Sequence, residues 1–288
     1  MNAHQTLVLD RMPAAGPAFF NAAMSGFRRP KGTPSLPALE LKVGKVAVDN
    51  ARLAAYNQLC GFEDNGSLPI TFPQVMAASM HIQLMSQKAF PLPLLGLVHV
   101  ANRIEQSAAL SAGAEYDVSV RTGEAREARL GLEFDLITEF AEVGEAPSWK
   151  AVTSILYRNK SGGGRKKTGA PQPAVAFGHY AEVVADADIG RRYGKVSGDI
   201  NPIHLTPWTA KLFGFKRAIA HGMWSLARSA ALLQPQLAQA PTELTVEFKR
   251  PLFLPGRAAL KFASEGEQMH FALIGSRGAE THLTGMLR

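Results

Sequence analysis

Cysteine is almost absent from this chain of 288 residues, since Cys60 is the single one. One thiol forms neither an intrachain disulfide nor a cysteine metal site, and a reducing, cytoplasmic location is therefore expected. Apolar runs of roughly eighteen residues without a charge are also lacking, so no membrane span is expected. The first residues have no basic start, and Asp10, Arg11 and Pro13 interrupt their short apolar run, which argues against a signal peptide.

Acidic residues are in the minority, with 24 of them against 31 Lys and Arg residues and a formal net charge of +7. This surplus favours anionic partners such as phosphates, carrier proteins or nucleic acids. Nucleic acid is the weakest of these, because no aromatic residues interleave a basic patch and no zinc-finger spacing occurs. With 46% hydrophobic and 19% charged residues, the composition is that of a globular protein of one large or two ordinary domains.

One break in composition divides the chain. Residues 159–173, NKSGGGRKKTGAPQP, are rich in Gly, Lys and Pro and lack periodic apolar positions, which is typical of a flexible linker. The alternative, a phosphate-binding loop, lacks the GxxxxGK[ST] spacing and the strand-to-helix context. We therefore expect an irregular extension at 1–36, a first domain at 37–158 and a second domain at 174–288.

The two domains repeat one pattern. Residues 49–62, DNARLAAYNQLCGF, align without a gap with residues 186–199, DADIGRRYGKVSGD, so that an Asp, a Tyr and a Gly coincide. A helix is predicted next in each half, at 73–87 and at 222–233. Both helices are apolar on most faces, and such a helix requires burial.

Strand patterns follow each helix, and the alternation is clearest at Tyr116, Val118 and Val120. The predicted strands are 94–100, 115–121, 130–139 and 150–158 in the first half and 244–249, 258–264, 268–276 and 281–288 in the second. A sheet with one apolar face wrapped around an apolar helix satisfies this pattern. We predict an α+β fold of two antiparallel sheets, each around a central helix, paired through edge strands as a pseudo-dimer.

The residues best suited to chemistry lie in YGKVSGDINPIHLTPWTA, residues 193–210. Pro202 stiffens this segment and disfavours a helix at Asn201, so an irregular loop is expected to aim Asp199 and His204 at one point. A carboxylate and an imidazole together hold a water molecule and exchange its proton with a substrate carbon. Taken by itself, the segment also fits an ordinary capped turn without a function.

The run SGDINPIHLTPWTA, followed by AIAHGMWSLA, resembles the MaoC-like (R)-specific enoyl-CoA hydratase and 3-hydroxyacyl-thioester dehydratase family. The family pattern is Gly, Asp, any residue, Asn, Pro, an aliphatic and His, and residues 198–204 fill every position. FKRPLFLPG at 248–256 is also similar. The close resemblance covers about residues 175–288 and a weaker one covers the first half.

This resemblance implies a double hot-dog fold and a hydro-lyase. Such an enzyme hydrates trans-2-enoyl thioesters and, in reverse, dehydrates (R)-3-hydroxyacyl thioesters of CoA or acyl carrier protein. The resemblance implies that Asp199 and His204 bind the catalytic water, one as base and one as acid, and that Asn201 fixes the loop or orients the water. It also implies that the Gly222 N–H binds the thioester carbonyl. Independent physics supports this last role, because a helix start leaves its N–H unpaired at the positive end of the dipole.

Further residues are predicted around this pair. Ser197 and His221 are expected to shape the site, the latter in a structural or capping role at the start of the helix. Candidates for contacts with CoA phosphates are Lys249 and Arg250, together with Lys211, Lys216 and Arg217. The remaining histidines that we expect at the surface of strands or helices are His81, His99, His179, His270 and His282.

No cofactor and no metal are expected, because no third ligand stands at helical or hairpin spacing from Asp199 and His204. The expected partner is the acyl thioester itself, with neither nucleic acid nor membrane, and the chain is expected to be a monomer with an internal pseudo-dimer or a homodimer. Two alternatives stay open: a thioesterase on the same fold, and a non-catalytic subunit that binds acyl thioesters. The complete motif and the intact Asp199–His204 pair favour the hydratase.

The first half lacks these residues. In the ungapped alignment Phe62 stands at the position of Asp199 and Cys60 at that of Ser197, and no histidine follows in residues 65–67. Pro73, which has no N–H to donate, falls near the position of Gly222. We therefore predict one active site per chain, with the first half as a scaffold and as one wall of the acyl pocket.

Changing the first half at these positions should spare the chemistry. Phe62→Leu and Ser67→Ala are expected to leave the rate of the chemical step unchanged and to alter only stability or chain-length preference. Enoyl-thioester hydration rates measured beside those of Asp199→Asn check this. A loss in either variant as large as that in Asp199→Asn would show that the first half is catalytic.

Overall fold

The computed structural model describes residues 5–14, 34–94, 96–158, 177–276, 278 and 280–288. The first half contains β1 (Gln5–Leu9), β2 (Leu39–Ala47), α2 (Asn50–Cys60), α3 (Phe72–Met76), α4 (Ala78–Met85), β3 (Leu97–Gln106), β4 (Glu115–Ala128), β5 (Gly131–Glu142) and β6 (Trp149–Arg158). The second half contains β7 (His179–Ala185), α5 (Ile189–Ser197), α6 (Pro202–Leu205), α7 (Pro207–Leu212), α8 (Gly222–Leu233), the 3-10 helix η1 (Gln234–Gln236), β8 (Glu243–Phe248), β9 (Gly256–Glu265), β10 (Gln268–Gly275) and β11 (Thr281–Leu287). None of the helices in these ranges is long and apolar enough to span a bilayer.

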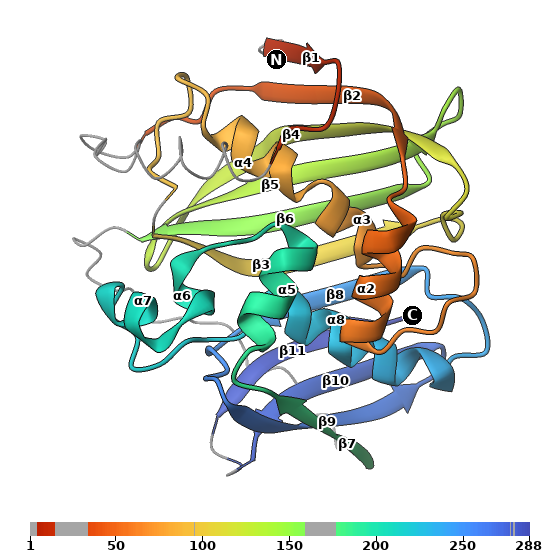
Figure 1. Cartoon of the computed structure of the whole chain (residues 1–288), viewed down its shortest axis with the longest axis vertical. Helices are drawn as coiled ribbons and strands as arrows, with labels where there is room; N and C mark the ends of the chain where they lie inside the picture. Colours follow the sequence, from red (N-terminus) through yellow and green to blue (C-terminus); the bar gives the residue numbers. More distant parts are fainter. Residues whose placement is uncertain (1–4, 15–33, 95, 159–176, 277, 279) are drawn as a thin grey trace.

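The described strands form one eleven-stranded sheet with the order β1-β2-β4-β5-β6-β3-β8-β11-β10-β9-β7 (Figure 1). Apart from the outermost strand β1, the order β2-β4-β5-β6-β3 of the first half recurs as β7-β9-β10-β11-β8 in the second. The inner edges β3 and β8 pair antiparallel, with Ala101 opposite Glu247 and Glu105 opposite Glu243. This arrangement confirms the predicted double hot-dog and its edge-to-edge joining, which removes two open edges.

The central helices lie on one face of this sheet and fill its apolar side (Figure 1). In the second half α8 begins and ends where the sequence predicts, and eight of its twelve residues are buried. The predicted alternation on β4 is also confirmed, because Tyr116, Val118 and Val120 are all buried. Helix and sheet thus bury each other's apolar faces in each half.

The first-half helix differs from the prediction of one continuous helix at 73–87. It consists of α3 and α4, which meet at Ala77, where the backbone has φ −80° and ψ −5°. Ala77 departs from the ideal helical ψ but still donates to the Pro73 carbonyl at 3.0 Å and accepts from the His81 N–H at 3.1 Å, so the break is local to this residue. Helix α3 begins at Phe72, with Pro73 as its second residue. When α3 and α8 are aligned by their first residues, Phe72 therefore matches Gly222, and Pro73 lies one residue after that position.

The two repeated segments, residues 49–62 and 186–199, carry no predicted secondary structure, and each contains a helix, α2 and α5 respectively. Each ends at a glycine in the left-handed conformation, Gly61 with φ 85° and Gly198 with φ 80°, which explains why glycine coincides in the repeat. Strands β2 and β7 also lack a prediction. The extension expected to be irregular contains β1, which pairs parallel to β2 along its whole length, so the expectation is wrong for this stretch. The predicted linker lies outside the described residues.

Candidate active site

The loop between α5 and α6 holds Asp199 through a series of local hydrogen bonds. The Asp199 N–H donates to Ser197 Oγ at 3.1 Å, and the Asn201 N–H donates to Asp199 Oδ1 at 3.1 Å. Asn201 Oδ1 in turn accepts from the Ile203 N–H at 3.3 Å. Side chains of this kind favour such local bonds to the backbone. The predicted site-shaping residues Ser197 and Asn201 are thus the ones that fix the Asp199 loop.

The segment after Asn201 is helical rather than irregular. Helix α6 begins at Pro202 with Asn201 as its N-cap, so the expectation of a loop running to His204 is wrong. The physical reason is that proline suits the first helical position, where its missing N–H costs nothing. The restriction that proline places on its neighbour still holds, because Asn201 itself is non-helical, with φ −55° and ψ 125°.

His204 is buried on α6 with a defined proton position. Its Nδ1 lies 2.8 Å from the carbonyl oxygen of Ile219, and a carbonyl only accepts, so Nδ1 carries the proton. The neutral ring therefore presents Nε2 as a lone-pair acceptor. Burial lowers the pKa of His204, against the opposing effects of the Asp199 charge and the Ile219 bond. The imidazole is consequently neutral at pH 7.

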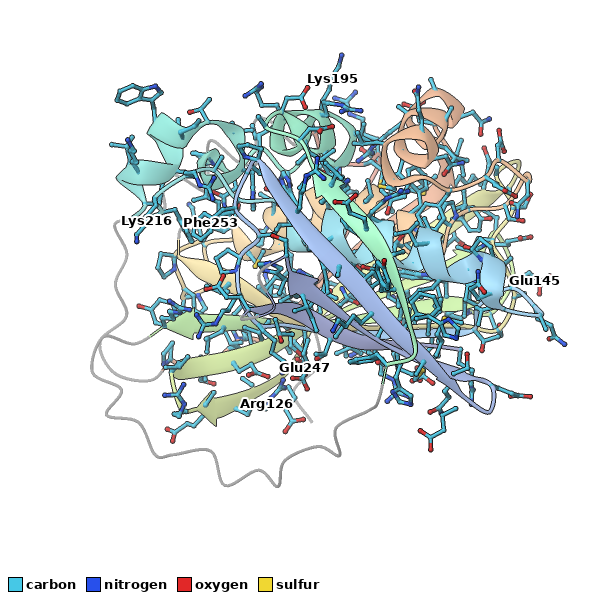
Figure 2. The ribbon with its side chains drawn as sticks, turned by 90° about the horizontal axis from the view of Figure 1, so that it is seen from below. Arg126, Glu145, Lys195, Lys216, Glu247 and Phe253 are labelled. Atoms are coloured by element: carbon cyan, nitrogen blue, oxygen red, sulfur yellow. The ribbon has the colours of Figure 1, made fainter. Side chains whose placement is uncertain are left out.

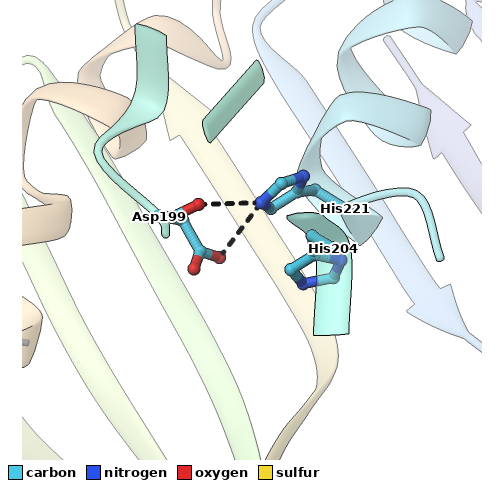
Figure 3. A group of neighbouring side chains, drawn as sticks. All are labelled: Asp199, His204 and His221. Atoms are coloured by element: carbon cyan, nitrogen blue, oxygen red, sulfur yellow. Dashed lines mark hydrogen bonds and ion pairs between the residues drawn. The ribbon is translucent and has the colours of Figure 1, made fainter. Parts of the chain in front are cut away.

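His221 is a second imidazole in the same place (Figure 3). Its Nε2 donates to the backbone carbonyl of Asp199 at 3.0 Å and lies 3.8 Å from Asp199 Oδ2. The ring stacks on that of His204, with centroids 3.7 Å apart and planes 25° apart. Burial, followed by the neighbouring His204, lowers the pKa of His221 to about 3. Although His221 precedes α8, its side chain makes no capping bond, so a capping role is wrong and the contacts are those of a site-shaping residue.

Asp199 remains open to water between these groups. Its side chain is 43% exposed, whereas that of His221 is 3% exposed. The surrounding protein by itself raises the pKa of this carboxyl, but His221, His204 and the Asn201 N–H oppose it and the net shift is downward. The site at neutral pH is therefore an ionised, water-accessible carboxylate beside two neutral imidazoles.

Gly222, the first residue of α8, lies against Phe248 at the end of β8. A Cβ at Gly222 would come within 2.9 Å of Phe248 Cε1, so the absence of a side chain keeps this helix start open. The Phe248 ring meets the His99 ring edge to face, with centroids 4.9 Å apart. His99 belongs to β3, and its contact with Phe248 brings this strand beside the start of α8. The first half thus reaches the site through β3.

The surface placement expected for the other histidines is wrong for His81 and His282, which are 8% and 7% exposed. His81 lies within α4 and its Nε2 bonds Thr138 Oγ1 at 2.7 Å. His99 is partly buried, and its Nε2 donates to the Ala101 carbonyl at 3.0 Å. Burial lowers the pKa of His81 to about 3 and that of His99 to about 4. Hydrogen bonds offset the burial of these neutral rings.

A third potential metal ligand is present, contrary to the expectation from spacing. One ligand atom each from Asp199, His204 and His221 lies within 4.8 Å of the other two. His221 escapes a search by spacing because it stands seventeen positions after His204, across the turn that precedes α8. His221 Nε2, the ring nitrogen beside the Asp199 carboxylate, donates its proton to the Asp199 carbonyl, so in this arrangement it offers no lone pair to a metal.

Two glycines on α5, which the sequence analysis does not single out, let the segment with Asp199 and His204 approach the helix closely. A Cβ at Gly190 would lie 1.9 Å from the His204 carbonyl oxygen, and a Cβ at Gly194 would lie 2.9 Å from that of Asp199. Their spacing of four residues places both on one face of the helix. A Gly-x-x-x-Gly pair directly before the motif is therefore a signal that could have been read.

The basic residues predicted to meet phosphates are exposed and engaged within the chain. Lys249 pairs with Glu247, and Arg250 lies 3.5 Å from Glu280. Lys211 lies over the Trp208 ring, and Lys216 is at the periphery of the molecule (Figure 2). No contact between these side chains and Asp199 occurs in the described part of the chain, so their binding role stays a prediction.

Comparisons with known proteins agree on one family. The model of the MaoC like domain matches residues 172–285. The 3-hydroxyacyl-thioester dehydratase X of Mycobacterium tuberculosis is 32% identical over 258 residues, which cover 89% of this chain and 91% of the relative. The crystal structure of HtdX from the same organism superposes with a TM-score of 0.75 at 30% identity, over 86% of this chain and 99% of the other. A MaoC-like dehydratase from Phytophthora capsici shares the fold, with a TM-score of 0.72 at 18% identity over 92% and 96% of the two chains.

Acid should destabilise the protein from about pH 6.5 downward, because histidines titrate there when unfolded. His81, His99 and His221 have folded-state pKa values of about 3, 4 and 3, so the unfolded chain takes up more protons. Their contribution is complete above pH 6.5, and each lowers the free energy of unfolding by up to about 1.4 kcal/mol per pH unit below it. Urea unfolding between pH 7.5 and 5 measures this slope. A free energy of unfolding that stays flat over that range would contradict the neutral, buried rings, and His81→Gln should reduce the slope.

Proposed function

The chain belongs to the family of MaoC-like dehydratases, and from this premise we propose that it removes water from (R)-3-hydroxyacyl thioesters and adds it to trans-2-enoyl thioesters. The relative named 3-hydroxyacyl-thioester dehydratase X supports the substrate class. The carrier is CoA or acyl carrier protein. A cytoplasmic location and the choice between a monomer and a homodimer stay predictions.

One observation carries the proposal: an ionised, accessible carboxylate beside an imidazole whose tautomer is fixed. Asp199 and His204 have ligand atoms within 4.8 Å of one another, a span that one water bridges. Since Ile219 holds the proton on Nδ1, His204 offers Nε2 to that water. A base needs this combination of position and free lone pair.

The electrostatics assign both proton transfers to His204 and a charge-stabilising role to Asp199. In hydration His204 Nε2 takes a proton from water while the water oxygen bonds to C3 and the C2=C3 electrons move toward the thioester carbonyl. The same proton then passes from the imidazolium to C2, so that H and OH have been added, and dehydration is the reverse. Asp199 has a lowered pKa, which makes it a poor acid and suits it to orienting the water and stabilising the imidazolium.

Gly222 is proposed to stabilise the negative charge that develops on the carbonyl oxygen. As the first residue of α8, it has an N–H without an acceptor inside the helix. The positive end of the helix dipole adds to the stabilisation that this N–H gives the oxygen. Phe248 and His99 lie beside this position and are proposed to form part of the pocket wall.

A spectrophotometric assay over a series of trans-2-enoyl-CoA chain lengths tests the function. Hydration removes the conjugated double bond without releasing thiol. A thioesterase would release free thiol instead, and a non-catalytic subunit would bind the thioester and change nothing. The same series with carrier-protein thioesters identifies the preferred carrier.

Loss of either member of the pair should abolish most of the turnover. Asp199→Asn removes the charge and His204→Ala removes the base, and each is expected to lower the rate roughly 10²–10⁴-fold. Circular dichroism should show a retained fold, because neither side chain belongs to the apolar core. Near-native rates in both variants would show that the site is assigned wrongly.

The N–H of Gly222 can be separated from the space around it. Gly222→Ala keeps the N–H but places a Cβ against Phe248, whereas Gly222→Pro adds this bulk and also removes the donor. Proline is tolerated at a first helical position. Turnover of the proline variant should fall below that of the alanine variant by about 10²–10³, the cost of one oxyanion donor. Equal rates in two folded variants would remove the carbonyl-polarising role.

A further inference from the structure

Arg52 connects the half without the catalytic pair to the loop that carries Asp199. It lies on α2, and its guanidinium donates from Nε to the Val196 carbonyl at 2.6 Å. Nη2 donates to the Ser197 carbonyl and to the Val75 carbonyl, each at 3.0 Å. The side chain is half-buried, and its three acceptors belong to the ends of two helices, α5 and α3. A guanidinium stays charged in this setting and presents its donors in a rigid fork.

The Val196 and Ser197 carbonyls lie at the end of α5, where backbone carbonyls need a hydrogen-bond donor from outside the helix. The last carbonyls of a helix have no partner within it and form the negative end of its dipole. Lys195, the basic residue in the last turn of α5, is exposed and points outward (Figure 2). The first half thus supplies, through Arg52, the side-chain donors to the last two carbonyls of α5.

Ser197, whose carbonyl Arg52 binds, stands two positions before Asp199. The Ser197 carbonyl accepts from Arg52, while Ser197 Oγ accepts the Asp199 N–H. The Asp199 carbonyl then accepts from His221 Nε2. A shift of Ser197 therefore moves both the carboxylate and the imidazole stacked on His204.

We propose that Arg52 is a positioning residue for the Asp199 loop, supplied by the half of the chain that lacks the catalytic pair. This inference rests on the proposed function for its kinetic test. Arg52 touches neither substrate nor water in this role and acts through Ser197. A second feature makes the role testable: Arg52, Ser197 and Gly198 line one opening of about 310 Å³, which admits a small cation.

The chain provides a matched control in Arg228. This residue of α8 donates from Nη1 to the Cys60 carbonyl at 3.1 Å, at the end of α2. This bond, like those of Arg52, joins a guanidinium of one half to a carbonyl at a helix end of the other. It supports the end of α2, which leads to Phe62, and not the end of α5, which leads to Asp199. Loss of Arg228 should therefore cost stability without moving the catalytic loop.

The experiment compares Arg52→Met with Arg228→Met in the full chain. Arg52→Met should lower kcat about tenfold or more with little change in KM, because a small misplacement of a catalytic group is costly. Arg228→Met should lower the melting temperature by a similar amount and keep kcat within about twofold. Arg52→Lys should restore part of the rate, and methylguanidinium should raise the kcat of Arg52→Ala while leaving that of Arg228→Ala unchanged.

Two results would overturn the inference: a kcat for Arg52→Met within about twofold of wild type, or equal losses of kcat in both methionine variants. If Arg52→Met does not fold, Arg52→Lys and the methylguanidinium rescue decide the question. Histidine NMR of the free protein adds a readout without substrate, since His221 should keep its Nε2 proton in Arg228→Met and lose this fixed tautomer in Arg52→Met. A wild type without hydration activity would instead contradict the proposed function and leave the NMR test standing.

Discussion

The antiparallel pairing of β3 with β8 is the contact on which the rest of the molecule depends. Each half alone would leave the inner edge of its sheet with unpaired N–H and C=O groups, and the pairing satisfies both edges at once. It also places His99 of β3 against Phe248 of β8, beside the start of α8. The same joining brings α2 to the end of α5, where Arg52 binds two carbonyls. The half without the catalytic pair is therefore built into the site.

The protonation states of the three site residues depend on their burial as well as on their hydrogen bonds and neighbouring charges. His204 and His221 are enclosed, so protonation would place a cation in a low-dielectric setting and both rings stay neutral. The surrounding protein acts against the charge of Asp199 as well, but the two histidines and the Asn201 N–H outweigh this effect, and the pKa of the carboxyl is lowered. In the proposed mechanism proton transfer requires a transient imidazolium, and the only charge in this group of three that can stabilise it is the adjacent carboxylate. Because His204 stacks on another neutral imidazole, His221, its protonated form would depend on Asp199 for stabilisation.

Local patterns in the sequence predict the parts of the fold whose contacts are local or periodic. Strand β4 and helix α8 follow from alternation and from apolar faces, and the Asp199 loop follows from residues that bond within three positions of each other. The break at Ala77 and strand β7 have no comparable signal, whereas β2 carries one that the prediction missed, since Leu39, Leu41 and Val43 alternate with polar residues and are buried. The roles of His221 and Arg52 depend on partners 22 and 145 positions away, which no local pattern specifies.

The repeat itself shows how one half differs from the other. Thr71 precedes α3 as His221 precedes α8, and Tyr56 bonds Thr71 Oγ1 at 2.8 Å. At the matching place the Tyr193 ring lies tilted beside the His221 ring, with centroids 4.9 Å apart, and the buried Nδ1 of His221 has no hydrogen-bond partner among the described residues. Phe72 is fully buried where Gly222 leaves a helix start open, and Phe62 stacks on Tyr56 where Asp199 meets water. The first half has used these positions to complete its core. In the second half Asp199 stays exposed, Gly222 leaves the helix start open, and His221, although buried, has an Nδ1 without a partner among the described residues. Such departures from a completed core are expected at positions that serve a function at the expense of stability.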